Sequence, residues 1–97
     1  MCAINGITVP DATERVVKMN SVTSRRGPEG SSVWSDHKIT LGHNLLATMA
    51  QVSNSTQPMH HNGNSIVFNG AIFNWKDIDE WDSEVDTQVL LKGLCTY

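Results

Sequence analysis

The sequence predicts an α+β fold, because strand-like segments and helix-like segments alternate along the chain. A β-branched pattern opens it, Ile4 followed by residues 7–9, which is typical of a β-strand. Near the middle, Asn62-Gly63 separates two strand-like runs, and Asn-Gly is the strongest short signal of a β-hairpin because both turn positions need a positive φ. Helix start signals stand near both ends of the chain. A hairpin and separate helices together indicate an α+β domain.

The first helix is expected directly after Pro10. Asp11 is a candidate N-cap, and Glu14, three residues on, would complete a capping box. Residues 24–31 have the composition of a loop. Its two arginines either bind an anion or are solvated, and we favour solvated side chains.

Two short strands are expected next, at residues 33–34 and 39–41, with residues 36–38 as the turn between them. Residues 44–57 are polar and carry few strand or helix signals. A connection of that length without structure of its own is uncommon and is usually functional or disordered.

The second half is expected to hold the two hairpin arms, a short helix or turn, an acidic loop and a final helix. The hairpin arms are expected at residues 59–61 and 65–68, and the short helix or turn at 72–78. The acidic loop is expected at 77–86 and the final helix at 88–95. Asp86 and Thr87 are the expected cap of the final helix. The acidic residues other than Asp86 are interpreted as solvated surface.

Length and composition exclude several classes of protein. The chain has 97 residues, enough for one small domain, and a net charge of −3. No basic stripe exists, so we expect no nucleic acid partner. No apolar run approaches the roughly 18 residues of a membrane span, and no leader opens the chain, so we expect no membrane association and a cytoplasmic location. Cys2 and Cys95 do not make a disulfide framework.

The histidines do not predict a metal site. Zinc sites usually contain a short pair of Cys or His ligands. His60 and His61 are adjacent, so in a strand they point to opposite faces and cannot serve one site. No phosphate-binding G-x-x-x-x-G-K loop occurs either. We therefore expect no metal and no cofactor in this segment.

Cys2 directly follows the initiator Met. After removal of Met1, Cys2 would carry a thiol nucleophile and a free α-amine that can act as its base. Taken alone, this pattern also fits a small buried cysteine near a terminus.

Six segments of the chain fit the pattern of one family in order and spacing. They are MCAI at residues 1–4, RRGPE at 25–29, LGH at 41–43, QPM at 57–59, VFNGAIFN at 67–74 and DTQVLL at 86–91. Together they resemble the amino-terminal part of a class II glutamine amidotransferase domain of the asparagine synthetase type. The resemblance extends over essentially the whole chain, so residues 1–97 are expected to form a single, partial domain of this type.

The resemblance implies an N-terminal-nucleophile hydrolase fold, an αββα sandwich of antiparallel sheets that is truncated here. It also implies that Cys2 attacks the side-chain amide of glutamine, forms a thioester and releases ammonia. Asn69 and Gly70 match the oxyanion hole, and Asp86 matches the acid that binds the glutamine α-amino group. Ammonia would pass to an ATP-dependent synthetase domain, and a second copy of the chain is the alternative partner that would complete the fold.

Three positions depart from the family pattern. Ala3 replaces the usual glycine, Leu45 stands where an arginine for the glutamine carboxylate is expected, and Ala71 replaces a glutamate. Met49 belongs to the segment that matches backbone lining the glutamine pocket. Loss of a charged contact to a carboxylate commonly costs about 2–5 kcal/mol. The departures leave open a second interpretation, a catalytically decayed remnant that acts as a binding or assembly module.

Overall fold

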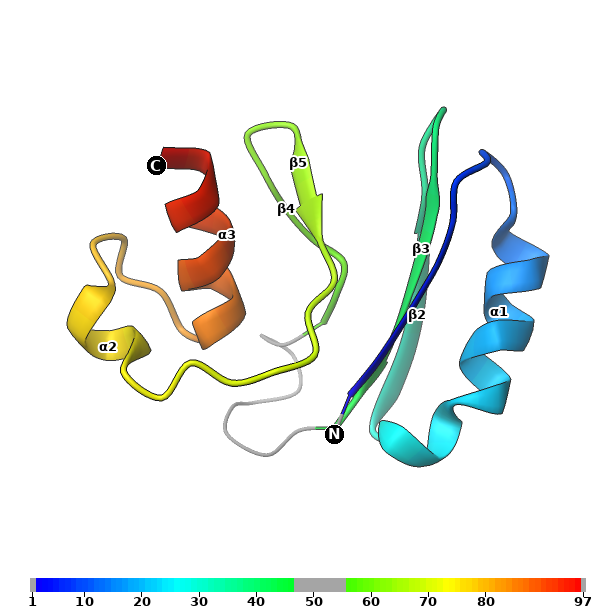
Figure 1. Ribbon diagram of the computed structural model, residues 1–97, viewed down its shortest axis with the longest axis horizontal. Helices are drawn as coiled ribbons and strands as arrows, with labels where there is room; N and C mark the ends of the chain where they lie inside the picture. Colours follow the sequence, from blue (N-terminus) through cyan, green and yellow to red (C-terminus); the bar gives the residue numbers. More distant parts are fainter. Residues whose placement is uncertain (1, 47–55, 97) are drawn as a thin grey trace.

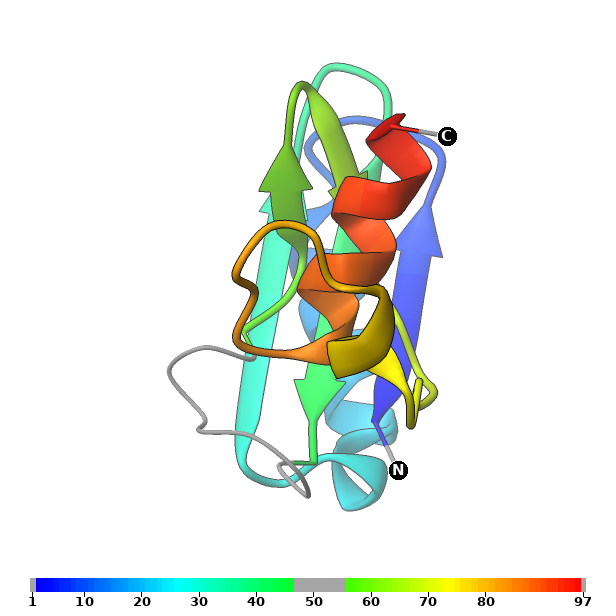
Figure 2. The ribbon, with the colours of Figure 1, turned by 90° about the vertical axis from the view of Figure 1, so that its left-hand side faces the viewer.

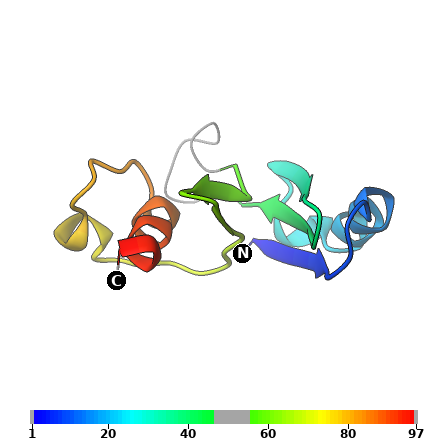
Figure 3. The same ribbon diagram turned by 90° about the horizontal axis from the view of Figure 1, so that it is seen from above.

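The computed structural model describes residues 2–46 and 56–96, and these residues form layers of helix, sheet, hairpin and helix (Figure 1). Helix α1 covers the outer face of a three-stranded sheet. A two-stranded hairpin lies on the other side of that sheet, followed by α3 and the short α2. The view from above shows the same succession (Figure 3), and the side view shows α3 in front of the hairpin (Figure 2). The mixed fold with antiparallel sheets confirms the predicted α+β class.

The larger sheet has the strand order β1-β3-β2, and both of its pairings are antiparallel. Its strands are β1 (Ala3–Ile7), β2 (Gly30–Ser35) and β3 (Thr40–Leu45). Residues 8–9 lie beyond β1, so the β-branched run predicted a strand that is two residues too long. In contrast, β3 extends to Leu45, beyond the predicted end at residue 41, because it pairs with β1 up to Asn44 and with β2 up to Leu45.

Helix α1 (Thr13–Val22) packs so closely on this sheet that β3 has no room for a side chain at Gly42. A Cβ at Gly42 would lie 2.4 Å from Val16 Cγ1 and 2.6 Å from Asn20 Oδ1. Asn20 also accepts a hydrogen bond from Asn5 Nδ2 at 2.8 Å and donates one to Ser31 Oγ at 3.1 Å. One buried amide therefore joins α1 to both outer strands.

We expect Gly42→Ala to lower the free energy of unfolding by about 1–3 kcal/mol, because the added methyl group overpacks the contact with Val16. Denaturant unfolding measures the change. Gly30→Ala is the matched control in the same sheet, since its Cβ would meet Leu45 Cβ at an ordinary 3.7 Å. Equal stability of the two variants would contradict the close packing of α1 on β3.

The predicted capping box at the start of α1 is wrong. The helix begins at Thr13 after Ala12, and no side chain caps it. Asp11 has a φ of 56° and precedes the cap position. The amide of Ala12 instead donates to Thr40 Oγ1 at 3.1 Å. A hydroxyl group from the sheet, distant in sequence, thus binds a donor at the helix start.

Both predicted turns are confirmed. The hairpin pairs β4 (Met59–His61) with β5 (Asn64–Ile66), and its turn residues Asn62 and Gly63 have φ values of 50° and 78°. In the turn between β2 and β3, Asp36 Oδ1 accepts hydrogen bonds from two backbone amides at 2.7 and 2.9 Å. These bonds lower the pKa of the Asp36 carboxyl.

The remaining elements are short helices and the final helix. They are the 3-10 helix η1 (Ser24–Arg26), α2 (Trp75–Ile78) and α3 (Asp86–Thr96). The final helix is confirmed, but Asp86 is its first helical residue, and its carboxylate bonds to Ile72 rather than capping the helix. The predicted irregular segment 44–57 is wrong at its start, where β3 continues; residues 47–55 lie outside the described part.

Candidate functional site

Cys2 lies at the entrance to β1, against the end of β3. The amide of Leu46 donates to Cys2 Sγ at 3.4 Å, and the half-buried thiol lies 3.8 Å from the Leu46 carbonyl oxygen. Arg26 Nε donates to the Cys2 carbonyl oxygen at 3.3 Å. Arg26, at the end of η1, is exposed as expected, and it also places a cation beside the backbone of the candidate nucleophile.

Leu45 ends β3 as a buried aliphatic residue, with 5% of its surface exposed. Its carbonyl oxygen accepts a hydrogen bond from the Glu29 amide at 3.0 Å. Gly27 packs directly on this stretch, since a Cβ there would lie 2.4 Å from the Asn44 carbonyl carbon. The position that the family pattern gives to an arginine thus supplies apolar packing and no charge.

Asn69, Gly70 and Ala71 lie between β5 and α2, in a segment that Figures 1, 2 and 3 all place beside the start of β1. Asn69 is half-buried, and its side chain forms no hydrogen bond with any other described residue. Gly70 is exposed, but a Cβ there would lie 2.7 Å from Phe68 Cζ. The structure therefore brings the predicted oxyanion-hole residues to the same end of the molecule as Cys2.

The loop that carries these residues, Phe68 to Ile72 and here called the 68–72 loop, is held at both ends. The Phe68 amide donates to Gln57 Oε1 at 2.6 Å, and the Ile72 amide donates to Asp86 Oδ2 at 2.9 Å. Asp86, predicted as a substrate-binding acid, is therefore at this loop and also fixes its backbone. Gln57 was not predicted as a site residue. It belongs to the Gln-Pro-Met segment at residues 57–59, one of the six segments that fit the family pattern, and this membership could have identified it.

His43 is buried beneath this loop, with 1% of its surface exposed. Burial lowers the pKa of the ring from its ordinary value of 6.5, while a hydrogen bond with the Phe68 backbone partly opposes the shift. Its Nε2 has no hydrogen-bond partner among the described residues. The ring therefore stays neutral in the folded protein over a wider pH range than in the unfolded chain.

This shift predicts that the protein loses stability as the pH falls below about 6.5. There the unfolded chain binds a proton at His43 before the folded protein does, so the free energy of unfolding decreases. The slope of unfolding free energy against pH should be smaller in His43→Gln. His37→Gln, in the exposed β2–β3 turn, is the matched control for replacement of a histidine. Measurements above about pH 5 avoid titration of the carboxylates.

The other predicted positions are less informative. Met49 lies outside the described residues, and Ala71 is exposed. Among residues 2–46 and 56–96, no three His, Cys, Asp or Glu side chains gather where they could hold a metal ion. Within the same ranges, no helix is long and apolar enough to cross a membrane.

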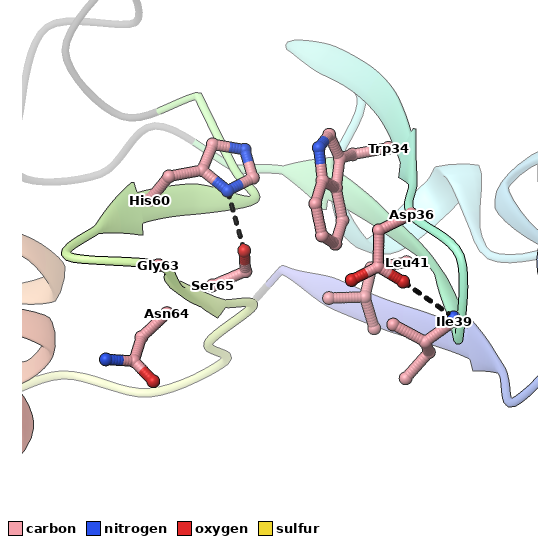
Figure 4. Close-up of a pocket in the computed structure, with 8 residues that line it drawn as sticks. All are labelled: Trp34, Asp36, Ile39, Leu41, His60, Gly63, Asn64 and Ser65. Carbon is pink, nitrogen blue, oxygen red and sulfur yellow. Dashed lines mark hydrogen bonds between the residues drawn. The ribbon is translucent and has the colours of Figure 1, made fainter.

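A cavity of about 390 Å³ lies between the larger sheet and the hairpin (Figure 4). The rings of Trp34 and His60 meet there, with centroids 4.8 Å apart. Leu41 also lines the cavity and pairs with Gly6, whereas Cys2 adjoins the opposite end of β1. The cavity therefore does not include the residues predicted for catalysis.

Comparisons with known proteins agree on one family. The sequence pattern of the family described as "Glutamine amidotransferase domain" matches residues 1–97. The chain is also similar to asparagine synthetase [glutamine-hydrolyzing] 3 of Bacillus subtilis (strain 168), with 29% identity over 108 residues and 94% of this chain covered. The chain spans 17% of the length of that relative. No solved structure matches it.

Proposed function

Because the chain belongs to the family of glutamine amidotransferase domains, we propose that it hydrolyses the side-chain amide of glutamine through a thioester on Cys2. The observation that carries this proposal is that the start of β1, with Cys2 before it, and the 68–72 loop lie side by side (Figure 1). A thiol and a pair of oxyanion donors are the two parts that amide hydrolysis of this kind needs.

The proposed reaction runs in two steps. After removal of Met1, the α-amine of Cys2 takes the thiol proton, and Sγ attacks the amide carbon of glutamine. The carbonyl oxygen becomes an oxyanion, which accepts hydrogen bonds from the Asn69 side chain and the Gly70 amide. The C–N bond then breaks and ammonia leaves with a proton. Water adds to the thioester, the C–S bond breaks, and glutamate leaves as the thiol is restored.

The groups proposed to hold the ends of glutamine are few. Asp86 is the proposed acid for the α-amino group, and Met49 belongs to the proposed backbone wall of the pocket. Leu45 and Ala71 supply no charge. Arg26, which bonds to the Cys2 backbone, is the proposed counter-charge for the substrate carboxylate. Arg26 is exposed and is the single proposed positive charge for the substrate carboxylate, so we expect weak binding and a high KM for glutamine.

The layer order of helix, sheet, hairpin and helix supports an N-terminal-nucleophile hydrolase sandwich as the finer fold of this domain (Figure 1). The relative described above is an asparagine synthetase, so we propose that ammonia passes to an ATP-dependent synthetase domain. A second copy of the chain is the alternative partner.

A non-catalytic module is the second candidate function. Buried, apolar Leu45 and uncharged Ala71 favour it, because both stand where the family pattern has charged residues. In this case the fold would serve binding or assembly and would release no ammonia.

One experiment separates the two candidates. The purified protein is weighed intact, incubated with glutamine while ammonia is measured, and then treated with diazo-oxo-norleucine, a glutamine-like electrophile. Loss of Met1, ammonia release and a single adduct on Cys2 are expected for the amidase. A processed terminus without ammonia release, or Cys2 reacting no faster than Cys95, would exclude the amidase and favour the module.

A further inference from the structure

Gln57 joins three parts of the molecule through a single buried residue, with 4% of its surface exposed. Its side-chain Oε1 accepts a hydrogen bond from the Phe68 amide at 2.6 Å, and its Nε2 donates to Thr87 Oγ1 on α3 at 3.3 Å. Its backbone oxygen accepts a hydrogen bond from Ser32 Oγ on β2 at 2.5 Å. The amide is therefore paired on both sides, as a buried polar group must be.

The hydrogen bond from the Phe68 amide to Gln57 fixes the chain directly before the proposed oxyanion donors. Strand β5 ends at Ile66, and residues 67–71 belong to no helix or strand, so no ladder of sheet hydrogen bonds fixes them. On the amino-terminal side of Asn69, the nearest anchors both lie at Phe68, whose amide bonds to Gln57 and whose backbone also bonds to the His43 ring. The anchor on the carboxyl-terminal side, the bond from the Ile72 amide to Asp86, lies beyond Ala71. Asn69 and Gly70 stand between two anchored peptides.

Resting on the proposed function, we infer that Gln57 is a positioning residue that sets the direction of the oxyanion donors. It does not touch the reacting atoms. Its Oε1 fixes the Phe68 peptide, and its Nε2 holds the amide plane in place through Thr87, next to Asp86. The two loop anchors thus share adjacent positions on α3, so the helix and β2 together set the geometry of the 68–72 loop.

The test compares two variants in the full chain. Gln57→Met keeps the length of the side chain but removes both hydrogen bonds. We expect it to lower kcat about 10–100-fold while KM changes little, because a displacement of about 1 Å can cost about 10²-fold in rate. Gln57→Glu keeps the acceptor for Phe68 but, when ionised, places a charge at this buried position and replaces the donor to Thr87 by a second acceptor, so the Thr87 hydroxyl must turn to donate. Its activity relative to wild type should rise as the pH falls and the carboxyl gains a donor proton.

Two further readouts separate positioning from general damage. Glutamate γ-semialdehyde adds to a thiol and leaves an oxyanion-like oxygen, whereas glutamate does not. In Gln57→Met, affinity for the aldehyde should fall more than affinity for glutamate. The rate of Cys2 alkylation by iodoacetamide should stay close to that of wild type, since alkylation does not use the oxyanion donors. Asn64→Ala is the control, because it removes a side-chain amide of the adjoining hairpin, which bonds to Cys95 Sγ instead of to the 68–72 loop.

The outcomes are distinct. A lower kcat with unchanged KM, a selective loss of aldehyde affinity and recovery of Gln57→Glu at low pH support the inference. Wild-type kcat in both variants overturns it and leaves the proposed function standing. Absence of ammonia release from wild type overturns both. If Gln57→Met does not fold, Gln57→Glu decides alone. A loss of activity that is constant with pH would then contradict the positioning role. Equal losses of affinity for the aldehyde and for glutamate would also contradict it.

Discussion

Replacing Cys2 by alanine is expected to abolish glutamine hydrolysis, with a fall of at least about 10³-fold in the rate of ammonia release. The alanine methyl group has no electron pair with which to attack the amide, and the remaining oxyanion donors bind the transition state without a nucleophile. Cys2→Ser should retain only a trace of activity, because a neutral hydroxyl is a weaker nucleophile than a thiol. Ammonia release under saturating glutamine measures the effect.

Cys95→Ser is the matched control for this prediction. Cys95 lies on α3 against the hairpin, where its Sγ is 3.6 Å from the His61 carbonyl oxygen and accepts a hydrogen bond from Asn64 Nδ2 at 3.3 Å. It takes no part in the proposed reaction, so activity should be unchanged. Intact mass must show that Met1 has been removed from each protein, because a retained Met blocks the α-amine. Unchanged ammonia release in Cys2→Ala would disprove the thioester mechanism.

The parts of the fold that the sequence could predict are those with local causes. Asn62-Gly63 predicted the hairpin because both residues adopt the positive φ that its turn needs. The turn at Asp36 is likewise formed by bonds to amides two and three residues away. In contrast, Asp11 is not the N-cap: it precedes the cap residue Ala12 with a φ of 56°, and the Ala12 amide bonds to Thr40, 28 residues further along the chain. Local patterns contain no information about such a partner.

The candidate site shows the same division. Cys2, Asn69 and Gly70 were identified through the family resemblance, and the fold brings their segments to one end of the molecule (Figure 1). The Gln-Pro-Met segment points to Gln57 as a residue of interest, but its partners could not be predicted, because they lie 11 and 30 residues away and only the folded chain brings them to one amide. The contact of Arg26 with the Cys2 backbone, across 24 residues, was missed for the same reason.

Asn69→Ala is expected to lower kcat for glutamine hydrolysis by about 10²–10³-fold, because one donor to the developing oxyanion is typically worth that factor. KM should change little, since the donor acts mainly when the carbonyl oxygen becomes charged. Asn69→Asp should lose more, because a carboxylate repels the oxyanion and offers no N–H donor. Steady-state kinetics with glutamine, on variants whose Met1 removal is verified by mass, measure both effects.

Asn74→Ala is the control for Asn69, because Asn74 is an exposed asparagine of the same connection and precedes α2 without capping it through its side chain. It should keep wild-type kcat. A rise in KM alone in Asn69→Ala would contradict the oxyanion role and assign the amide to substrate binding instead. We also expect Asn69→Ala and Gln57→Met to lower kcat to a similar extent, and the double variant to lose little more. This result would show that both residues act through one group. This non-additivity is expected where one residue orients the donor that the other supplies.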